Sequence, residues 1–191
     1  MKSLLIVVTL VLCCAAAGQA SVIFETAALT GAAEIPPTGS PGTGLASVLY
    51  DSVLHTLTVD VSFTGLLGTT TASHIHCCIA QPGNAGVATT TPTFAGFPLG
   101  VTSGTYHTVL DLTLASSWNP AFISANGGTT ASAEATLASG LANDETYLNI
   151  HTTVDPGGEI RGVLVSPEPA TWTLMGTSLL GLLGARRRRL F

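Results

Sequence analysis

Two segments in which apolar and polar residues alternate place the narrowest limit on the fold. Leu57–Phe63 reads Leu-Thr-Val-Asp-Val-Ser-Phe, and Tyr106–Leu114 places Tyr, Thr and three Leu residues at every second position. Successive side chains of an extended strand point to opposite faces, so each segment predicts a β-strand with one buried face. The region between residues 21 and 165 has no long helical periodicity, which predicts an all-β domain.

Weaker strand patterns account for much of the remaining domain. They cover Val22–Leu29, Leu45–Tyr50, Ser73–Ala80, Tyr147–Thr152 and Ile160–Val165. The sequence Asp155-Pro156-Gly157-Gly158 predicts a turn that joins the last two strands as a hairpin. Seven strands with glycine-rich connections favour an antiparallel Greek-key β-sandwich.

Two short helices and one long loop complete the predicted domain. Asn119 as a cap with Pro120 in the first turn predicts a helix that stops at the following Gly-Gly pair. A second helix is predicted over Ala131–Ala138. Gly83–Gly100 contains prolines and no alternation, so it is predicted to be a loop.

The distribution of charge excludes one large class of partners. Of the six basic residues, only Arg161 falls between residues 21 and 165, whereas ten of the eleven acidic residues lie there. A strongly acidic domain repels the phosphate backbone, so the sequence excludes nucleic-acid binding.

The first 20 residues have the pattern of a secretory signal peptide. Lys2 is followed by an apolar stretch over Leu4–Ala17 and by Gly18-Gln19-Ala20, a small-residue cleavage site. We therefore predict a signal peptide at residues 1–20 and a mature domain at residues 21–165. Its removal would leave Cys77 and Cys78 as the cysteines of the mature chain.

Residues 166–191 form a second targeting segment. Its parts are Pro167, Glu168 and Pro169, an apolar segment at 170–185, and Arg186, Arg187, Arg188 and Arg189. The 16 residues of the apolar segment span about 24 Å as a helix, and long arginine side chains extend that reach, so we predict a C-terminal transmembrane helix. Positive charge after this helix places the C-terminus in the cytoplasm and the domain outside.

The tail resembles a PEP-CTERM sorting signal in its three parts and their order: the Pro167-Glu168-Pro169 motif, one hydrophobic span and a terminal arginine cluster. The resemblance implies recognition by an exosortase, a membrane protease-transferase of Gram-negative bacteria that make exopolysaccharide. It also implies export through the inner membrane, transient anchoring, and sorting to the cell surface or extracellular matrix. A plain C-terminal membrane anchor is the alternative.

Residue types that bind metals gather in one predicted strand, Ser73–Ala80. Alternation places His74, His76 and Cys78 on one face, with successive Cα atoms about 6.5–7 Å apart. This spacing lets two imidazoles hold one ion, so the strand predicts a copper or zinc site with Cys78 as a further ligand. Surface or packing histidines are the alternative. A disulfide between the neighbours Cys77 and Cys78 would close a strained ring, so free thiols, a bond to a partner or a metal thiolate at Cys78 all stay open.

The strand over Tyr147–Thr152 offers a third imidazole. Asn149 and His151 share a face of this strand, so His151 is predicted as a ligand with Asn149 in support. Glu159 and Arg161 share the polar face of the next strand. There they are predicted to form an ion pair or to hold His151 in one tautomer.

The domain resembles the CHRD domain, a module named after chordin, which is a secreted binder of growth factors. The likeness extends from about Phe24 to Val165 and rests on five segments in order: Ala28–Pro37, Phe63–Leu66, Thr71–His76, Tyr147–Thr152 and Gly157–Gly162. It implies a secreted or surface protein, with no established enzymatic activity.

The His-x-His strand and the Gly-Glu-Ile-Arg-Gly hairpin also resemble copper/zinc superoxide dismutase, itself a β-sandwich. This resemblance implies His74, His76 and His151 as copper ligands. It does not extend to a histidine-rich zinc loop, because Gln81–Gly104 contains no histidine. The expected sandwich is therefore either immunoglobulin-like or superoxide dismutase-like.

Three functions follow from these features. The leading hypothesis is a non-enzymatic surface or matrix protein whose domain binds a protein partner or contributes structure. The second is a copper- or zinc-binding protein, or a superoxide dismutase-like oxidoreductase, that uses the three histidines. The third is a module that binds exopolysaccharide, which follows from the sorting route.

Overall fold

A computed structural model describes residues 22–167 of the chain. The predicted signal peptide at 1–20, the transmembrane segment at 170–185 and the arginine cluster at 186–189 lie outside the described residues, as do Glu168 and Pro169. Among residues 22–167, no helix is long and apolar enough to cross a membrane.

Seven strands form one sheet in the described part of the chain. They are β1 (Val22–Thr30), β2 (Thr43–Asp51), β3 (Thr56–Thr64), β4 (Thr70–His76), β5 (Gly104–Asp111), β6 (Tyr147–Thr152) and β7 (Ile160–Val163). Their order across the sheet is β4-β6-β7-β1-β2-β3-β5, and all six neighbouring pairs are antiparallel. The prediction of an antiparallel all-β fold is confirmed.

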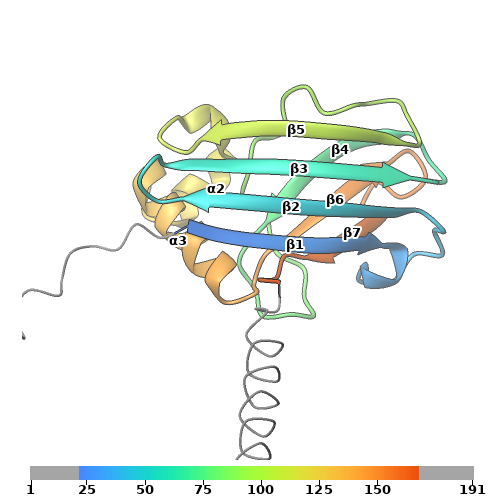
Figure 1. The fold of residues 1–191 in the computed structure, drawn as a ribbon, viewed down its shortest axis with the longest axis horizontal. Helices are drawn as coiled ribbons and strands as arrows, with labels where there is room; N and C mark the ends of the chain where they lie inside the picture. Colours follow the sequence, from blue (N-terminus) through green and yellow to red (C-terminus); the bar gives the residue numbers. More distant parts are fainter. Residues whose placement is uncertain (1–21, 168–191) are drawn as a thin grey trace, which may run out of the picture.

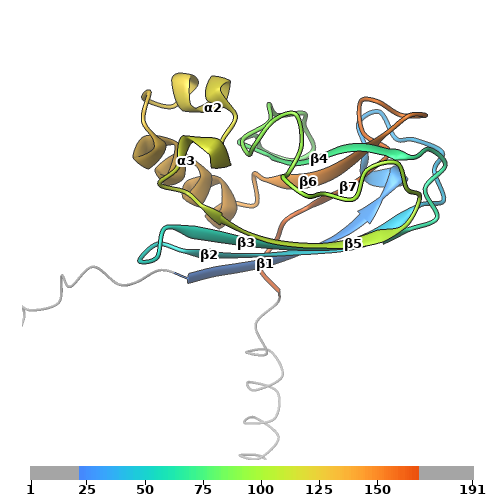
Figure 2. The same ribbon diagram turned by 90° about the horizontal axis from the view of Figure 1, so that it is seen from above.

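The sheet is curled into a half-barrel with two layers (Figure 1). Figure 2 shows β1, β2, β3 and β5 in one layer, here called the wide layer, and β4, β6 and β7 in the other, the narrow layer. The layers join where β1 meets β7, through the Thr30–Arg161 pair and the Thr26–Val165 bridge. This join makes one continuous sheet where two packed sheets were expected, because accumulated strand twist brings the ends of the sheet face to face.

Strand β3 shows how alternation becomes burial in the wide layer. Its buried residues are Leu57, Val59, Val61 and Phe63. The intervening residues Asp60 and Ser62 are exposed on the outer face of the layer. Each fully buried apolar side chain stabilises the fold by about 1.5–3 kcal/mol, which fixes this register against a one-residue slip.

The narrow layer is covered on both faces. Ile75 of β4 and Leu148 of β6 are fully buried in the core, and the opposite face of these strands is mostly buried as well. The long connection after β4 runs beside that strand and touches it through the His76–Val87 bridge. Residues 83–100 contain no regular strand, as predicted. β4 ends at His76 rather than at Ala80, because the chain turns away into this connection.

Short helices close one end of the half-barrel (Figures 1 and 2). Helix α2 (Pro120–Ala125) begins after Asn119, whose side chain accepts a hydrogen bond from the N–H of Ala121, as the cap prediction requires. Helix α3 (Thr130–Ala142) begins at a capping box on Thr129 and is longer than predicted. Two 3-10 turns, η1 (31–33) and η2 (115–117), complete the structure.

Candidate metal site

Three histidines come together on the outer face of the narrow layer. His74 and His76 lie on β4, and His151 lies on β6, where it pairs with Ala72 of β4. One ring nitrogen from each histidine lies within 4.8 Å of the corresponding atoms of the other two. The shortest approach is 3.3 Å, between Nδ1 of His74 and Nε2 of His151. The period-two pattern of both strands predicted that these three side chains share a face, and the structure brings them together there.

The second nitrogen of each ring donates to a backbone carbonyl. Nε2 of His74 lies 2.6 Å from the oxygen of Pro92, and Nδ1 of His76 lies 2.9 Å from that of Ala85. Nδ1 of His151 lies 2.8 Å from the oxygen of Pro156. A carbonyl accepts but cannot donate, so each contact fixes the proton on that nitrogen. The lone pairs are thereby left on Nδ1 of His74 and on Nε2 of the other two rings.

Burial keeps the three imidazoles neutral. Burial lowers the pKa of His76 to about 4, although hydrogen bonding to Ala85 acts in the opposite direction. The pKa values of His74 and His151 are also lowered, again mainly by burial. A neutral imidazole is the form that binds a metal, so protons do not compete for these nitrogens at neutral pH.

The separation of the nitrogens suits a single ion. Imidazole nitrogens bind zinc at about 2.0–2.1 Å, which sets two ligands at a tetrahedral angle about 3.3–3.4 Å apart. The 3.3 Å contact between His74 and His151 has this value. The ligand nitrogen of His76 lies within 4.8 Å of the other two. The three residues thus fit a transition-metal ion such as copper or zinc.

Asn149 supports the cluster from β6. It pairs with His74 across the strands, and its Oδ1 atom lies 3.1 Å from Nε2 of His76. The single lone pair of Nε2 cannot serve both this amide and a metal ion, so an ion at the cluster would take the place of this contact. Ser73 fixes the backbone beneath it, because the Ser73 hydroxyl donates to the Asn149 carbonyl over 2.8 Å.

The predicted pairing of Glu159 with Arg161 is not found. Arg161 lies 3.8 Å from the carboxylate of Glu34 instead, and both side chains are buried. Glu159 accepts hydrogen bonds from Ser40, Leu67, Gly68 and Thr152. Although burial raises its pKa, these bonds outweigh burial and lower it. Glu159 therefore ties loops together, and Pro156, rather than Glu159 or Arg161, holds the His151 ring.

Cys78 takes no part in the cluster. The structure joins Cys77 and Cys78 in a disulfide, the arrangement for which the sequence predicted a strained ring. A disulfide sulfur has no thiolate to offer a metal. In addition, β4 ends at His76, so the alternation that was predicted to carry Cys78 onto the histidine face does not continue.

A family comparison accounts for most of the described residues. The model of the CHRD domain matches residues 26–164. The chain belongs to the CHRD family. Searches of curated proteins and of solved structures found no match.

A second comparison concerns the tail of this CHRD protein. The model of the PEP-CTERM protein-sorting motif matches residues 167–189. Such a motif is recognised by an exosortase. The CHRD domain is therefore exported, anchored transiently in the membrane before processing, and carried to the cell surface.

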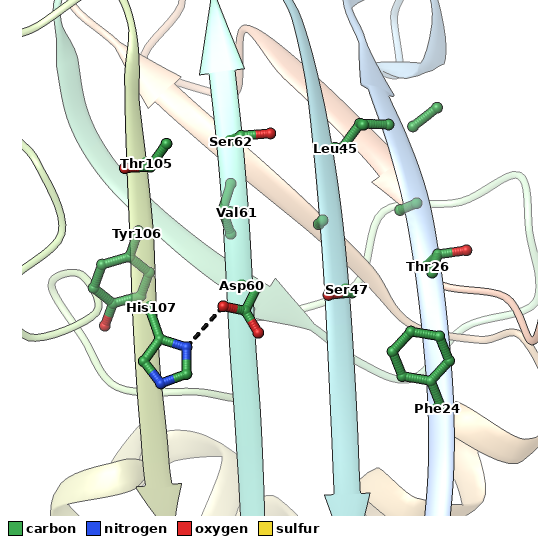
Figure 3. Close-up of a pocket in the computed structure, with 13 residues that line it drawn as sticks. Phe24, Thr26, Leu45, Ser47, Asp60, Val61, Ser62, Thr105, Tyr106 and His107 are labelled. Atoms are coloured by element: carbon green, nitrogen blue, oxygen red, sulfur yellow. Dashed lines mark hydrogen bonds and ion pairs between the residues drawn. The ribbon is translucent and has the colours of Figure 1, made fainter.

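The outer face of the wide layer of the CHRD domain carries a shallow groove of about 830 Å³. Figure 3 shows short side chains along its floor, with Phe24 at one side and His107 at the other. Nδ1 of His107 lies 2.7 Å from Oδ1 of Asp60 in this groove. A second hollow of about 800 Å³ continues past Leu45 and is lined by no charged side chain. Sequence reasoning gave these residues no role.

Proposed function

We propose that the exported CHRD domain binds one copper or zinc ion through His74, His76 and His151. The observation that carries the proposal is that the two nitrogens of each ring have different partners. One nitrogen of each ring is available to a shared ion, and the other donates to a backbone carbonyl. Metal-binding histidines nearly always donate their second N–H to such an acceptor, which fixes the ring and raises its basicity.

Three protein ligands leave a coordination position for a small molecule. A surface protein that stores or carries a metal would use the cluster without catalysis. A superoxide dismutase-like oxidoreductase, the alternative predicted from sequence, would use the same three ligands. Both forms of the proposal therefore depend on the same first measurement, and turnover of superoxide by the loaded protein distinguishes them.

The test is metal stoichiometry in the full-length chain purified with detergent. The protein is incubated separately with copper(II) and zinc(II), dialysed and analysed by mass spectrometry of the elements. We expect one ion per chain, lost in His76→Ala and in His151→Gln. The exposed His107→Ala is the matched control and retains the ion. An empty wild-type protein, or unchanged content in both cluster variants, refutes the proposal.

A second candidate, binding of exopolysaccharide, is supported by the groove on the wide layer. The groove and the second hollow beside it are rich in hydroxyl groups: Thr26, Ser47, Ser62, Thr105, Thr30, Thr43, Thr64 and Ser103. Phe24 is 48% exposed at its edge and offers a flat ring to a sugar. Sedimentation with matrix polymer isolated from producing cells tests this candidate. We expect Phe24→Ala to reduce binding, whereas equal binding by the variant and the wild type contradicts it.

The domain boundaries are also part of the proposal. We infer cleavage after Ala20 and a mature domain of residues 21–165, because Gly18-Gln19-Ala20 has the small residues of a cleavage site and the sorting motif matches residues 167–189. The intact mass of protein recovered from the cell surface tests both ends. A mass that retains residues 1–20 would contradict the signal peptide.

A further inference from the structure

A buried arginine lies behind the histidine cluster. Arg161 of β7 is 2% exposed, and β7 pairs it with Asn149. Its Nε atom donates to the oxygen of Ala33 over 2.6 Å, and Glu34 lies 3.8 Å away. Burying a guanidinium is costly unless its charge and its donors are matched. The contacts of the remaining N–H groups of Arg161 therefore show which part of the chain this side chain holds in place.

Those donors hold the loop that lies over His76. Nη1 of Arg161 donates to Oδ1 of Asn84 over 2.7 Å and to the oxygen of Gly83 over 3.3 Å. The next residue in the loop is Ala85, whose carbonyl accepts from Nδ1 of His76. Arg161 thus fixes the two residues that precede the acceptor of His76.

Tyr147 makes the same connection by another route. Its ring stacks on that of His76 with centroids 4.7 Å apart and planes 8° apart, and the Arg161 guanidinium lies 4.6 Å from the centroid of the same ring. Its hydroxyl lies 3.2 Å from both the nitrogen and the oxygen of Ala85. Two side chains of neighbouring strands therefore hold consecutive residues of this loop: Arg161 holds Gly83 and Asn84, and Tyr147 holds Ala85.

The position of the Ala85 carbonyl decides which nitrogen of His76 carries its lone pair. With the Ala85 carbonyl in place, Nδ1 is the donor, so the lone pair of the neutral ring lies on Nε2. If the carbonyl moved, the ring could carry its proton on Nε2 and would no longer offer a ligand there. His74 and His151 use different carbonyls, so the effect is specific to His76.

We propose that Arg161 and Tyr147 are positioning residues that act through Asn84 and Ala85 to fix His76 as an Nε2 ligand. The proposal rests on the proposed metal function. It differs from the role predicted from sequence, in which Arg161 supports His151.

The test uses the full-length chain and substitutions that spare the core. Asn84 is exposed, so Asn84→Ala removes the acceptor of Arg161 without opening a cavity. Asn84→Asp keeps an oxygen for Arg161 and loses the N–H that donates to the Ile35 carbonyl, so it is the rescue variant for the Arg161 contact. Tyr147→Phe keeps both ring contacts and removes the hydroxyl alone. Asn143→Ala, at an exposed cap of α3, is the matched control.

Copper(II) affinity is measured by competition with a chelator. We expect Asn84→Ala and Tyr147→Phe to bind about 10–100-fold more weakly, the usual effect of removing a group that orients a ligand. Asn84→Asp and Asn143→Ala should stay near the wild type. If Asn84→Ala and Tyr147→Phe both bound copper(II) as tightly as the wild type, the proposal would be overturned.

Nitrogen NMR of the imidazoles in metal-free protein gives a second readout that stability alone does not move. We expect His76 to carry its proton on Nδ1 in the wild type and to gain the Nε2 tautomer in Asn84→Ala. An unchanged tautomer overturns the proposal even if the wild type binds no metal. Absence of metal from the wild type, with the tautomer shift present, refutes the metal function alone.

Discussion

The two layers of the half-barrel share one core but differ in what covers their outer faces. Loops cover the narrow layer, and its outer face holds imidazoles, Asn149 and Arg161 in a buried polar network. The wide layer is open on that side and carries short hydroxyl side chains along a groove (Figure 3). Buried polar groups must satisfy one another, whereas exposed ones can use water. We therefore expect substitutions of buried polar residues in the narrow layer to destabilise the fold strongly, and substitutions of exposed polar residues in the wide layer to have little effect.

The largest difference in stability between the two layers is expected when the Glu159 carboxylate is removed. Glu159→Ala leaves the N–H groups of Leu67 and Gly68 and the hydroxyl of Thr152 without their acceptor in a fully buried position. We expect a loss of about 3–5 kcal/mol in the free energy of unfolding, measured with urea. Asp60→Ala on the wide layer should change it by less than about 0.5 kcal/mol. Equal losses of unfolding free energy in Glu159→Ala and Asp60→Ala would contradict the difference between the two layers.

Acid should weaken the narrow layer through His76. Its pKa of about 4 lies below the ordinary 6.5, so the unfolded chain binds a proton that the folded chain does not. The stability due to the neutral ring is present above pH 6.5 and is lost as the pH falls toward 4, by about 3 kcal/mol.

Urea unfolding of metal-free wild type and His76→Gln between pH 7.5 and 4 isolates this effect. The difference between the two proteins removes the contribution of Glu25 and Glu34, whose raised pKa values make stability fall as pH rises above 4.5. A difference that stays constant over this range contradicts the assignment.

A single methyl group should disturb the narrow layer at Gly158. A Cβ atom there would lie 2.6 Å from Oε1 of Glu34 and 2.7 Å from Nδ2 of Asn149, and φ is +133°. We expect Gly158→Ala to cost about 2–3 kcal/mol, read as the shift of the urea midpoint. The neighbouring Gly157→Ala meets nothing within 4 Å and should be close to neutral. Similar urea midpoints for both variants would show that Glu34 and Asn149 can move to accommodate the added methyl group, which contradicts a tightly packed narrow layer.

The smallest effect on stability is expected on the wide layer. Ser62 is exposed on the groove floor between β2 and β5. Ser62→Ala should change the free energy of unfolding by less than about 0.5 kcal/mol and leave bound metal unchanged. Its sedimentation with matrix polymer sharpens the comparison further, because a loss of binding without a loss of stability would assign the groove a function of its own.

Local patterns predicted the parts of the fold that depend on local physics. The alternation of Leu57–Phe63 became β3, and Asn119 with Pro120 became the start of α2. The same period of two placed His74, His76 and His151 on common faces of their strands. Strand periodicity and caps are decided by neighbouring residues, so a sequence displays them directly.

Long-range contacts were not visible in the sequence. Nothing near Arg161 indicates Glu34 as its partner, because the two are brought together only when β7 pairs with β1. The carbonyls that orient the histidines belong to loops without periodicity, and backbone groups carry no sequence signature. The disulfide was predicted to be strained and is nevertheless present, which also removed Cys78 from the ligand set.

X-ray absorption of the copper- or zinc-loaded full-length chain tests the central claim most directly. Three imidazoles on one ion predict nitrogen neighbours at about 2.0–2.1 Å together with the outer-shell scattering of imidazole rings. Both features should weaken when His76 or His151 is replaced. A spectrum with sulfur at about 2.3 Å, or with oxygen neighbours and no imidazole scattering, would contradict the site.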